Sequence, residues 1–326
     1  MRSFANFISL FCEMPLSDKT KQYLIAVAKL LVVGLAFYFI YNELANNDRL
    51  DWIRFREKFE KNSTWYGILF ILLLSVLNRY LEILKWQNLV SSFRTISVGE
   101  TTKQVLAALT AAIFTPNGLG EYGAKALFFE KEKRKKIVFL NLICNGVQMV
   151  LTVIFGFFGL LYFNFYFEVI SIRTLALIIS VVFAITMILI LLRKANVKGY
   201  SIEKLLAKIS TLPKIIHRKN LLLAILRYLT FSHQYYFLFL AFDVDLPYLL
   251  LMSAITSVYF LASSLPTFQF LDFAVKGSVA VFFFGLAGVN EWIVVFITML
   301  MWFLNVVLPV VIGSYYVLRF KPQWKH

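Results

Sequence analysis

Two apolar stretches of this chain are each interrupted by a proline and then resume with an acidic residue and a lysine four positions apart. The first interruption reads TPNGLGEYGAK and the second reads LPTFQFLDFAVK. Their ionisable residues are Glu121 with Lys125 and Asp272 with Lys276. Residues four apart are neighbours on a helix surface, so each couple can form an ion pair. Because charge is energetically costly in a membrane-like apolar sequence, these couples predict a functional site.

The first interruption contains the residue types that end one helix and begin another. Pro116 removes a backbone donor, and Gly118 and Gly120 permit backbone conformations that other residues avoid. Asn117 is a candidate N-cap for the helix that follows. The free amide groups at the start of that helix favour an anion, which we expect to be the Glu121 side chain or a lipid phosphate.

The composition identifies the solvent of the protein. Of the 326 residues, 60% are hydrophobic, and the mean hydropathy is +0.74. Soluble proteins contain only about 45 to 50% apolar residues. Apolar runs such as 23–41 and 175–192 have the roughly 20 residues needed to cross a bilayer, and the alternation typical of a membrane β-barrel is absent. We therefore predict an all-α polytopic membrane protein, with residues 1–326 forming a single transmembrane domain.

Hydrophobicity predicts full spans separated by the two broken segments. The full spans are expected near 23–41, 66–90, 137–165, 171–192, 219–242 and 290–318, and the broken segments at 101–130 and 248–286. The connections on one side of the membrane carry 21 Lys and Arg, against 6 on the other. Because cytosolic loops are enriched in Lys and Arg, we predict that both termini are cytosolic. Residues 1–22 then form a cytosolic arm, since they lack the pattern of a cleaved signal peptide.

Each half of the chain has the order span, span, broken segment, span. The arms expected for the first broken segment, 101–114 and 119–130, reach only about 21 and 18 Å, and those of the second, 248–264 and 268–284, about 25 Å, against about 30 Å of hydrocarbon. Because three crossings is an odd number, the second half is inverted, so the first hairpin opens to the cytosol and the second to the outside. We therefore predict an inverted repeat of a first half at about 23–165 and a second at about 171–318, each with three spanning helices plus a re-entrant or proline-broken hairpin. The alternative is a set of unrelated proline-kinked helices.

Further ionisable residues in the predicted spans extend the candidate site. Arg79, Glu82 and Lys85 share roughly one face of the second span, and Arg227 lies in the span at 219–242. Such residues are expected to face a cavity or a partner and not lipid. Two interpretations stay open, a self-neutralising structural network and a polar path for a charged headgroup. The candidate substrate-binding residues are Arg79, Glu82, Lys85, Pro116, Asn117, Gly118, Gly120, Glu121, Lys125, Arg227, Asp272 and Lys276.

Other kinds of site find no support in the sequence. Three scattered histidines and two distant cysteines, Cys12 and Cys144, predict neither a metal site nor a disulfide. The sequence has no nucleophile with a base in reach, no nucleotide-binding loop and no dinucleotide fingerprint, so we expect no catalytic residue and no cofactor. The net charge of +15 is concentrated at span ends, which favours a topology signal or anionic headgroups over nucleic acid.

The first broken segment also carries a family resemblance. The run TPNGLGEYGAKALFFEKEKRKK resembles the hallmark of the flippase-like family named for the transmembrane region of lysylphosphatidylglycerol synthase, the multiple peptide resistance factor. KWQNLV at 85–90 is similar to the basic-Trp ending of that family's second span. Pro266 falls where a second motif with an acid is expected, although PTFQFLD lacks the family's glycines.

The resemblance implies lipid translocation, with roles for the Pro, Gly and Glu residues of the first motif and for Pro266 and Asp272 in the second. In the full synthase this region moves an aminoacylated lipid, while relatives serve polyprenyl-linked sugars or hopanoid pathways. We expect no aminoacyl-transferase domain within residues 1–326. The predicted function is a lipid flippase or lipid-linked headgroup transporter of the cell inner membrane, with a neighbouring synthase as a candidate partner.

The predicted mechanism moves an anionic headgroup between basic side chains while the acyl chains stay in lipid. Glu121 and Asp272 would balance charge or carry protons. The basic side chains are Arg79, Lys85, Lys125, Arg227 and Lys276. The alternatives are a membrane enzyme that uses Glu121 or Asp272 as an acid or base on lipid or polyprenyl phosphate, and a non-transporting scaffold for a lipid synthase.

Overall fold

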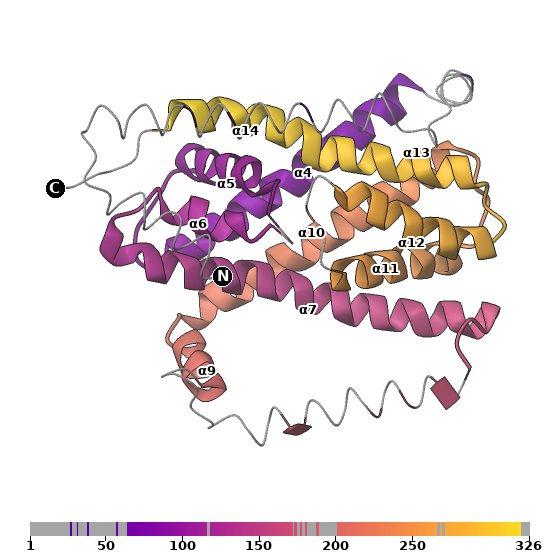
Figure 1. Ribbon diagram of the computed structural model, residues 1–326, viewed down its shortest axis with the longest axis horizontal. Coiled ribbons are helices and arrows are strands. Elements are labelled where there is room, and N and C mark those ends of the chain that lie inside the picture. The colour runs from indigo at the N-terminus through magenta and orange to yellow at the C-terminus, as the bar shows by residue number, and fades with distance from the viewer. Residues whose placement is uncertain are drawn as a thin grey trace.

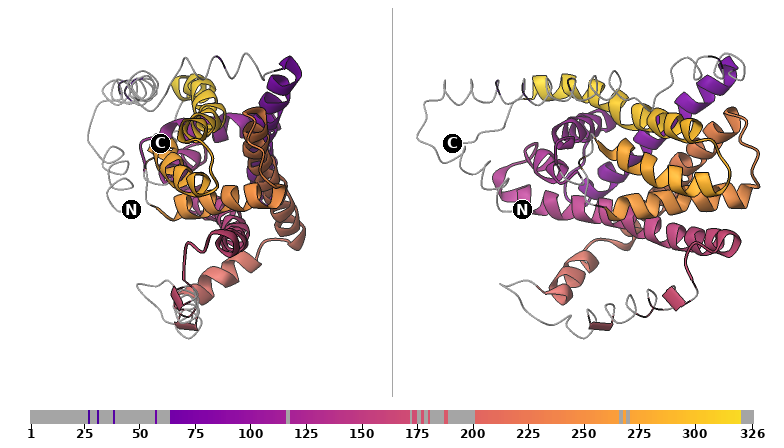
Figure 2. Two further views of the ribbon diagram at one scale, coloured as in Figure 1. Left: turned by 90° about the vertical axis from the view of Figure 1, so that its right-hand side faces the viewer. Right: turned by 45° about the vertical axis from the view of Figure 1, so that its right-hand side comes forward.

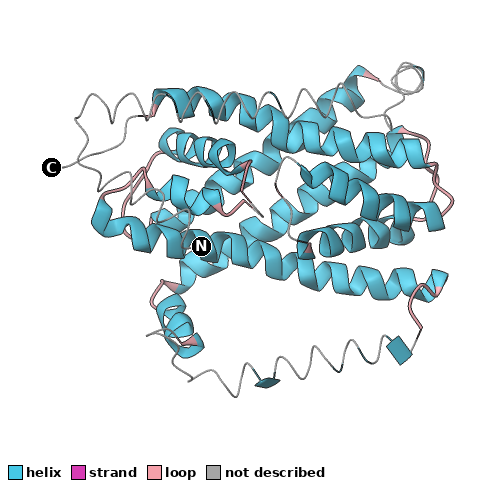
Figure 3. Ribbon diagram, viewed as in Figure 1, coloured by secondary structure: helices cyan, strands magenta, loops and turns pink. Residues whose placement is uncertain are grey.

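The computed structural model describes residues 64–115, 118–171, 201–265 and 271–320, with a few isolated positions elsewhere. The described residues form helices and connecting loops without a β-strand, which confirms the predicted all-α class (Figure 3). The arm predicted at 1–22 and the spans predicted at 23–41 and 171–192 lie outside these ranges.

Within the described residues, three helical stretches are long and apolar enough to cross a membrane, and they coincide with the spans predicted at 66–90, 137–165 and 290–318. These stretches are α4 (Trp65–Val90), the 3₁₀ turn η1 (Lys131–Lys133) with α7 (Arg134–Phe167), and α13 (Glu291–Trp302) with the π-helical turn η4 (Phe303–Val307) and α14 (Leu308–Arg319). Polar residues such as His233 and Gln234 lower the hydropathy of α10 (Lys214–Ala241), so the span predicted at 219–242 stays a prediction.

Each broken segment forms two helices joined by a break. The helices are α5 (Val98–Ala112) with α6 (Gly120–Ala126), and α11 (Tyr248–Ser264) with α12 (Asp272–Leu286). At 1.5 Å per residue they are about 22, 10, 25 and 22 Å long. The helix α6 is shorter than the arm predicted at 119–130, because the chain turns after Ala126 before it enters η1. The second arm begins at Asp272, four residues later than the predicted Phe268.

The hairpin helices lie between α7 on one side and the column formed by α13 and α14 on the other (Figure 1). In the packing of these helices, α5 contacts α14, α6 contacts α7, α11 contacts α7 and α12 contacts α13. The first hairpin occupies one end of the described bundle and the second the opposite end, as the right-hand view in Figure 2 also shows. The helices α4 and α10 pack along one another. The short amphipathic helix α9 (Ile202–Ser210) precedes α10.

Small residues allow two of the helix pairs to pack closely. A Cβ atom added at Gly159 of α7 would collide with the Thr256 hydroxyl of α11, and one added at Gly313 of α14 would collide with the Thr110 hydroxyl of α5. The Thr110 hydroxyl also donates to the Val310 carbonyl at 3.1 Å. Close contact of this kind is typical of helix packing in membranes, where van der Waals contacts and hydrogen bonds drive helix association.

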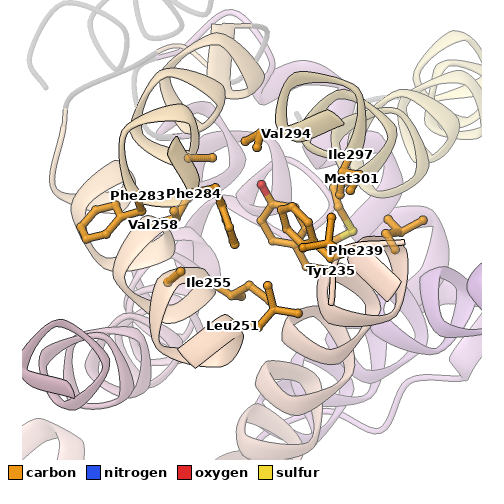
Figure 4. Close-up of a cluster of buried hydrophobic side chains, with 14 of the residues drawn as sticks. Tyr235, Phe239, Leu251, Ile255, Val258, Phe283, Phe284, Val294, Ile297 and Met301 are labelled. Carbon is orange, nitrogen blue, oxygen red and sulfur yellow. The ribbon is translucent and has the colours of Figure 1, made fainter. Parts of the chain in front are cut away.

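Apolar side chains form clusters near both ends of the bundle. One cluster comes from α7, α10, α11, α12 and α13 and includes Phe239, Phe284 and Ile297 (Figure 4). A second comes mainly from α4 to α7 and includes Leu89 and Ile137. Along α4, α7 and α10, polar residues lie between the stretches that belong to these clusters. The fold therefore places its polar interior near the middle of the long helices.

We expect Gly159→Ala to lower the free energy of unfolding by about 1–3 kcal/mol, because overpacking forces neighbouring groups apart. Gly285→Ala is the matched control, since a Cβ atom there has no neighbouring atom within 4 Å. Unfolding in detergent micelles by heat or denaturant measures both variants. Equal loss of stability in the two variants would contradict a close contact between α7 and α11.

Candidate functional site

A cavity of about 610 Å³ lies where the two broken segments meet α4, α7, α10 and α13. Leu119 from the first break and Ser263 beside the second both line it. The charged side chains that line it are Arg79, Glu82, Glu121, Arg227, Asp272 and Lys276. The fold thus brings together six candidate residues that are spread over almost 200 positions of the sequence.

Glu82 of α4 is the carboxylate of the largest ion network at this cavity. Its Oε2 atom lies 2.5 Å from Nη2 of Arg227 and 3.8 Å from Nη1 of Arg79, and its side chain is only 8% exposed. Gln148 of α7 accepts hydrogen bonds through one oxygen from Lys85 at 3.2 Å and from Arg227 at 3.3 Å. Among the described residues, this network therefore joins three cations to one carboxylate and links α4, α7 and α10.

A break in the third long stretch holds Arg79 in place. Pro309 has no backbone N–H, so it cannot donate to a carbonyl of the preceding turn, and the helix widens there into η4. The Leu304 carbonyl accepts a hydrogen bond from the Ser75 hydroxyl at 2.8 Å, and the Asn305 carbonyl accepts one from Nη2 of Arg79 at 2.5 Å. Because Ser75 and Arg79 are four apart, one face of α4 satisfies both carbonyls.

Asn305 is a cavity residue that was not predicted from the sequence. Its side-chain oxygen accepts a hydrogen bond from Asn78 at 2.6 Å, and its side-chain nitrogen donates one to Gln234 at 3.0 Å. One side chain therefore joins α4, α10 and η4. The sequence does carry a signal for it, since an asparagine stands in an apolar run four residues before Pro309. Helical turns of the π type occur frequently at functional sites.

Glu121 and Lys125 form the ion pair predicted for the first broken segment. The ammonium group of Lys125 also donates to Asn141 at 2.8 Å and lies 4.4 Å from the ring centre of Trp86. Glu121 lines the cavity, whereas Lys125 is fully buried behind it. Lys125 therefore anchors Glu121 to α4 and α7 and does not line the expected headgroup path.

The backbone around Gly118 and Gly120 explains why this break uses glycine. Gly118 has a φ of +66°, a conformation that disfavours other residues, and a Cβ atom on Gly120 would lie 2.8 Å from the Thr115 side chain. The Thr115 hydroxyl accepts a hydrogen bond from the Gly120 amide at 2.8 Å, and the Gly118 carbonyl accepts one from the Glu121 amide at 3.0 Å. The amides of Gly120 and Glu121 are therefore not free to bind an anion, and for them the prediction is wrong.

Leu119 holds the N-cap position of α6, without a capping side-chain hydrogen bond. The predicted cap, Asn117, lies outside the described residues, as do Pro116 and Pro266.

Asp272 and Lys276 form the pair predicted for the second broken segment, with 2.5 Å between Oδ2 and Nζ. Both line the cavity, and both side chains are partly exposed, unlike the buried Lys125. The ammonium group of Lys276 lies 5.5 Å from the ring centre of Tyr259, within range of a cation–π interaction. This pair is therefore open to a ligand on the cavity side.

Lys85 was expected on the headgroup path but, like Lys125, it does not line the cavity. It lies six residues beyond Arg79 on α4, next to Trp86 in the apolar cluster, and is fully buried. Arg79, Arg227 and Lys276 are thus the basic residues that reach the cavity.

The cavity has the chemistry to hold an anion. A guanidinium group carries five N–H donors. The described acceptors around Arg79 are the Asn305 carbonyl and Glu82, and those around Arg227 are Gln148 and Glu82, so each arginine keeps donors for an oxyanion. Glu121 and Asp272 supply carboxylates that can compensate charge or accept a proton.

No family model matches the sequence, and no curated protein or solved structure matches it.

We expect Glu82→Gln to destabilise the protein by about 3–5 kcal/mol, because it leaves two buried guanidinium groups without their carboxylate. The control is Glu100→Gln, whose surface pair with Arg94 at 3.4 Å should contribute less than about 1 kcal/mol. Denaturant unfolding in micelles gives both values. If Glu82→Gln were as stable as Glu100→Gln, the network would not hold α4 against α10.

Proposed function

We propose that this chain is a lipid flippase or lipid-linked headgroup transporter of the cell inner membrane. The observation that carries the proposal is the cavity of about 610 Å³ with six charged side chains, in a bundle with three helical stretches of membrane-spanning character. Charged residues within membrane segments are rare and usually mark a pathway or a binding site. The resemblance of the segment around Glu121 to the flippase-like family supports the same function.

An anionic headgroup is the substrate that the local charge favours. Arg79, Arg227 and Lys85 meet at one network with Glu82 as its carboxylate. A phosphate group would compensate this excess of positive charge and accept hydrogen bonds from the remaining guanidinium N–H groups. We therefore assign Arg79 and Arg227 to headgroup binding and Glu121 and Asp272 to charge balance during transfer.

An inverted repeat is the architecture that we propose for the two halves. In this scheme α4 corresponds to α10, α5 to α11, α6 to α12, and α7 to the column of α13 and α14. When corresponding helices of the two halves are exchanged, the contact between α5 and α14 is replaced by the contact between α11 and α7, and both contacts are observed. The same exchange leaves the contact between α4 and α10 unchanged. The exchange also relates two close contacts, that of Gly313 with Thr110 and that of Gly159 with Thr256. This pattern favours inversion over a set of unrelated kinked helices.

The placement of the hairpins supports re-entry from opposite sides. Each hairpin helix is shorter than the roughly 30 Å of hydrocarbon, and the two hairpins occupy opposite ends of the bundle (Figure 1). The end with the first hairpin also carries the start of α7, next to the basic run Lys131–Lys136. We propose that this end is cytosolic, as the positive-inside rule requires.

A flipping assay in proteoliposomes tests the function. Fluorescent phosphatidylglycerol is incorporated, and a membrane-impermeant quencher reports the fraction that reaches the outer leaflet. We expect wild-type protein to accelerate exchange over protein-free vesicles. Glu121→Gln and Asp272→Asn should slow it by about tenfold, which corresponds to about 1.4 kcal/mol of activation free energy. Asp272→Asn is included because its pair is partly exposed, so folding should tolerate its loss.

Glu100→Gln serves as the control, because it removes the same charge from a surface pair outside the cavity. Wild-type rates equal to those of protein-free vesicles, or full activity in both cavity variants, would contradict the proposal. A covalently changed lipid in mass spectra of the vesicles would favour a membrane enzyme instead. Co-purification with a lipid synthase in the absence of flipping would favour a scaffold.

A further inference from the structure

A stripe of cavity-lining residues on α7 reaches the outer surface of the bundle. Leu142, Gly146 and Met149 are spaced by four and three residues, so they follow one face of the helix. All three line the cavity, yet the side chains of Leu142 and Met149 are 44% and 55% exposed. Residues that line a cavity and are also exposed mark the place where the cavity opens.

The other exposed residues of the cavity wall lie beside the two hairpin breaks. Leu119 is 44% exposed, Ser263 is also exposed, and both line the same cavity. A Cβ atom added at Gly146 would have no neighbouring atom within 4 Å, so described protein atoms leave space beside this position. We call these exposed residues of the cavity wall, Leu119, Leu142, Met149 and Ser263, together with Gly146, the lateral mouth.

In the proposed membrane placement, with α7 spanning the bilayer, the lateral mouth lies at hydrocarbon depth. Leu142 and Met149 follow the start of α7 at Arg134 by about 12 and 23 Å along the helix axis. That distance falls within a hydrocarbon layer of about 30 Å. Three of its five residues are large and apolar, whereas the cavity behind it contains six charged side chains. In this placement the mouth faces acyl chains, whereas the cavity behind it is polar.

We propose that the lateral mouth holds the hydrocarbon chain of an amphiphile whose anionic headgroup occupies the cavity. The charged interior suits the headgroup, and the apolar rim at hydrocarbon depth suits the chain. The inference rests on the proposed function and narrows its ligand to a lipid that enters from the side. Free phosphate shares the headgroup chemistry but would gain nothing from the apolar rim.

Photolabelling in nanodiscs tests this inference. One probe is phosphatidylglycerol with a diazirine in its acyl chain, and a second is diacylglycerol with the same labelled chain but no anionic headgroup. We expect the first probe to label the α7 peptide around Leu142 and Met149 about tenfold more than the second, equivalent to about 1.4 kcal/mol of binding free energy. Excess inorganic phosphate should not abolish this labelling.

Gly146→Trp should remove the preferential labelling, because an indole ring would fill the mouth. Gly285→Trp is the matched control, since that exposed glycine of α12 also has no atom within 4 Å of an added Cβ and does not line the cavity. It should label as wild type does.

Several results would overturn the inference. Equal labelling by the two probes would assign the signal to bulk lipid, and full competition by phosphate would assign the cavity to a soluble anion. Unchanged labelling in Gly146→Trp would place the chain elsewhere. A photoreactive residue at position 149 that crosslinks to another segment of the same chain would show that protein covers the mouth.

The flipping assay separates this inference from the proposed function. Preferential labelling at the mouth without flipping would contradict the transport proposal and leave the binding inference standing. A wild-type flipping rate in Gly146→Trp would contradict the inference that the lateral mouth holds the chain, and it would leave the transport proposal standing.

Discussion

The ion pair between Glu82 and Arg227 joins the two helices around which the rest of the cavity is arranged. It links α4 to α10, and Arg79 extends the network through the Asn305 carbonyl to the third long stretch. A buried charge that loses its partner is strongly destabilising, so the positions of these helices depend on one another. The same pairing keeps two guanidinium groups at the cavity wall, where their remaining donors determine what the cavity can hold.

Three interruptions of the described helices lie at this cavity. In a membrane, backbone without helical hydrogen bonds is tolerated only where it is buried in protein or lines a polar space. Leu119 and Ser263 beside the two breaks, and Asn305 in the π-helical turn, all line the cavity. The hydrogen bonds that helices lose at these places are replaced by Thr115 at the first break and by Ser75 and Arg79 at η4. The interruptions thus place polar backbone and charged side chains in one region of an otherwise apolar bundle.

Local features of the fold could be predicted from the sequence. The all-α class, three of the spans and the couples of Glu121 with Lys125 and Asp272 with Lys276 depend on hydrophobic periodicity and on spacing along one helix. These signals extend over one turn or one span, so a single sequence contains them in full.

Features that depend on contacts between distant segments could not be predicted. Asn305 contacts Asn78 across 227 positions, and no periodicity connects them. The burial of Lys85 and Lys125 depends on neighbouring helices, which decide whether a basic side chain faces the cavity or the protein behind it. The hydrogen bond that occupies the Gly120 amide could not be predicted either, because its acceptor, the Thr115 hydroxyl, lies ahead of the break.

The binding of an anionic lipid in the cavity is tested most directly by a cryo-electron microscopy structure in nanodiscs that contain phosphatidylglycerol. We expect headgroup density at Arg79 and Arg227, with a chain leaving through the lateral mouth. A resolved cavity with lipid density only on the outer surface of the bundle would contradict it.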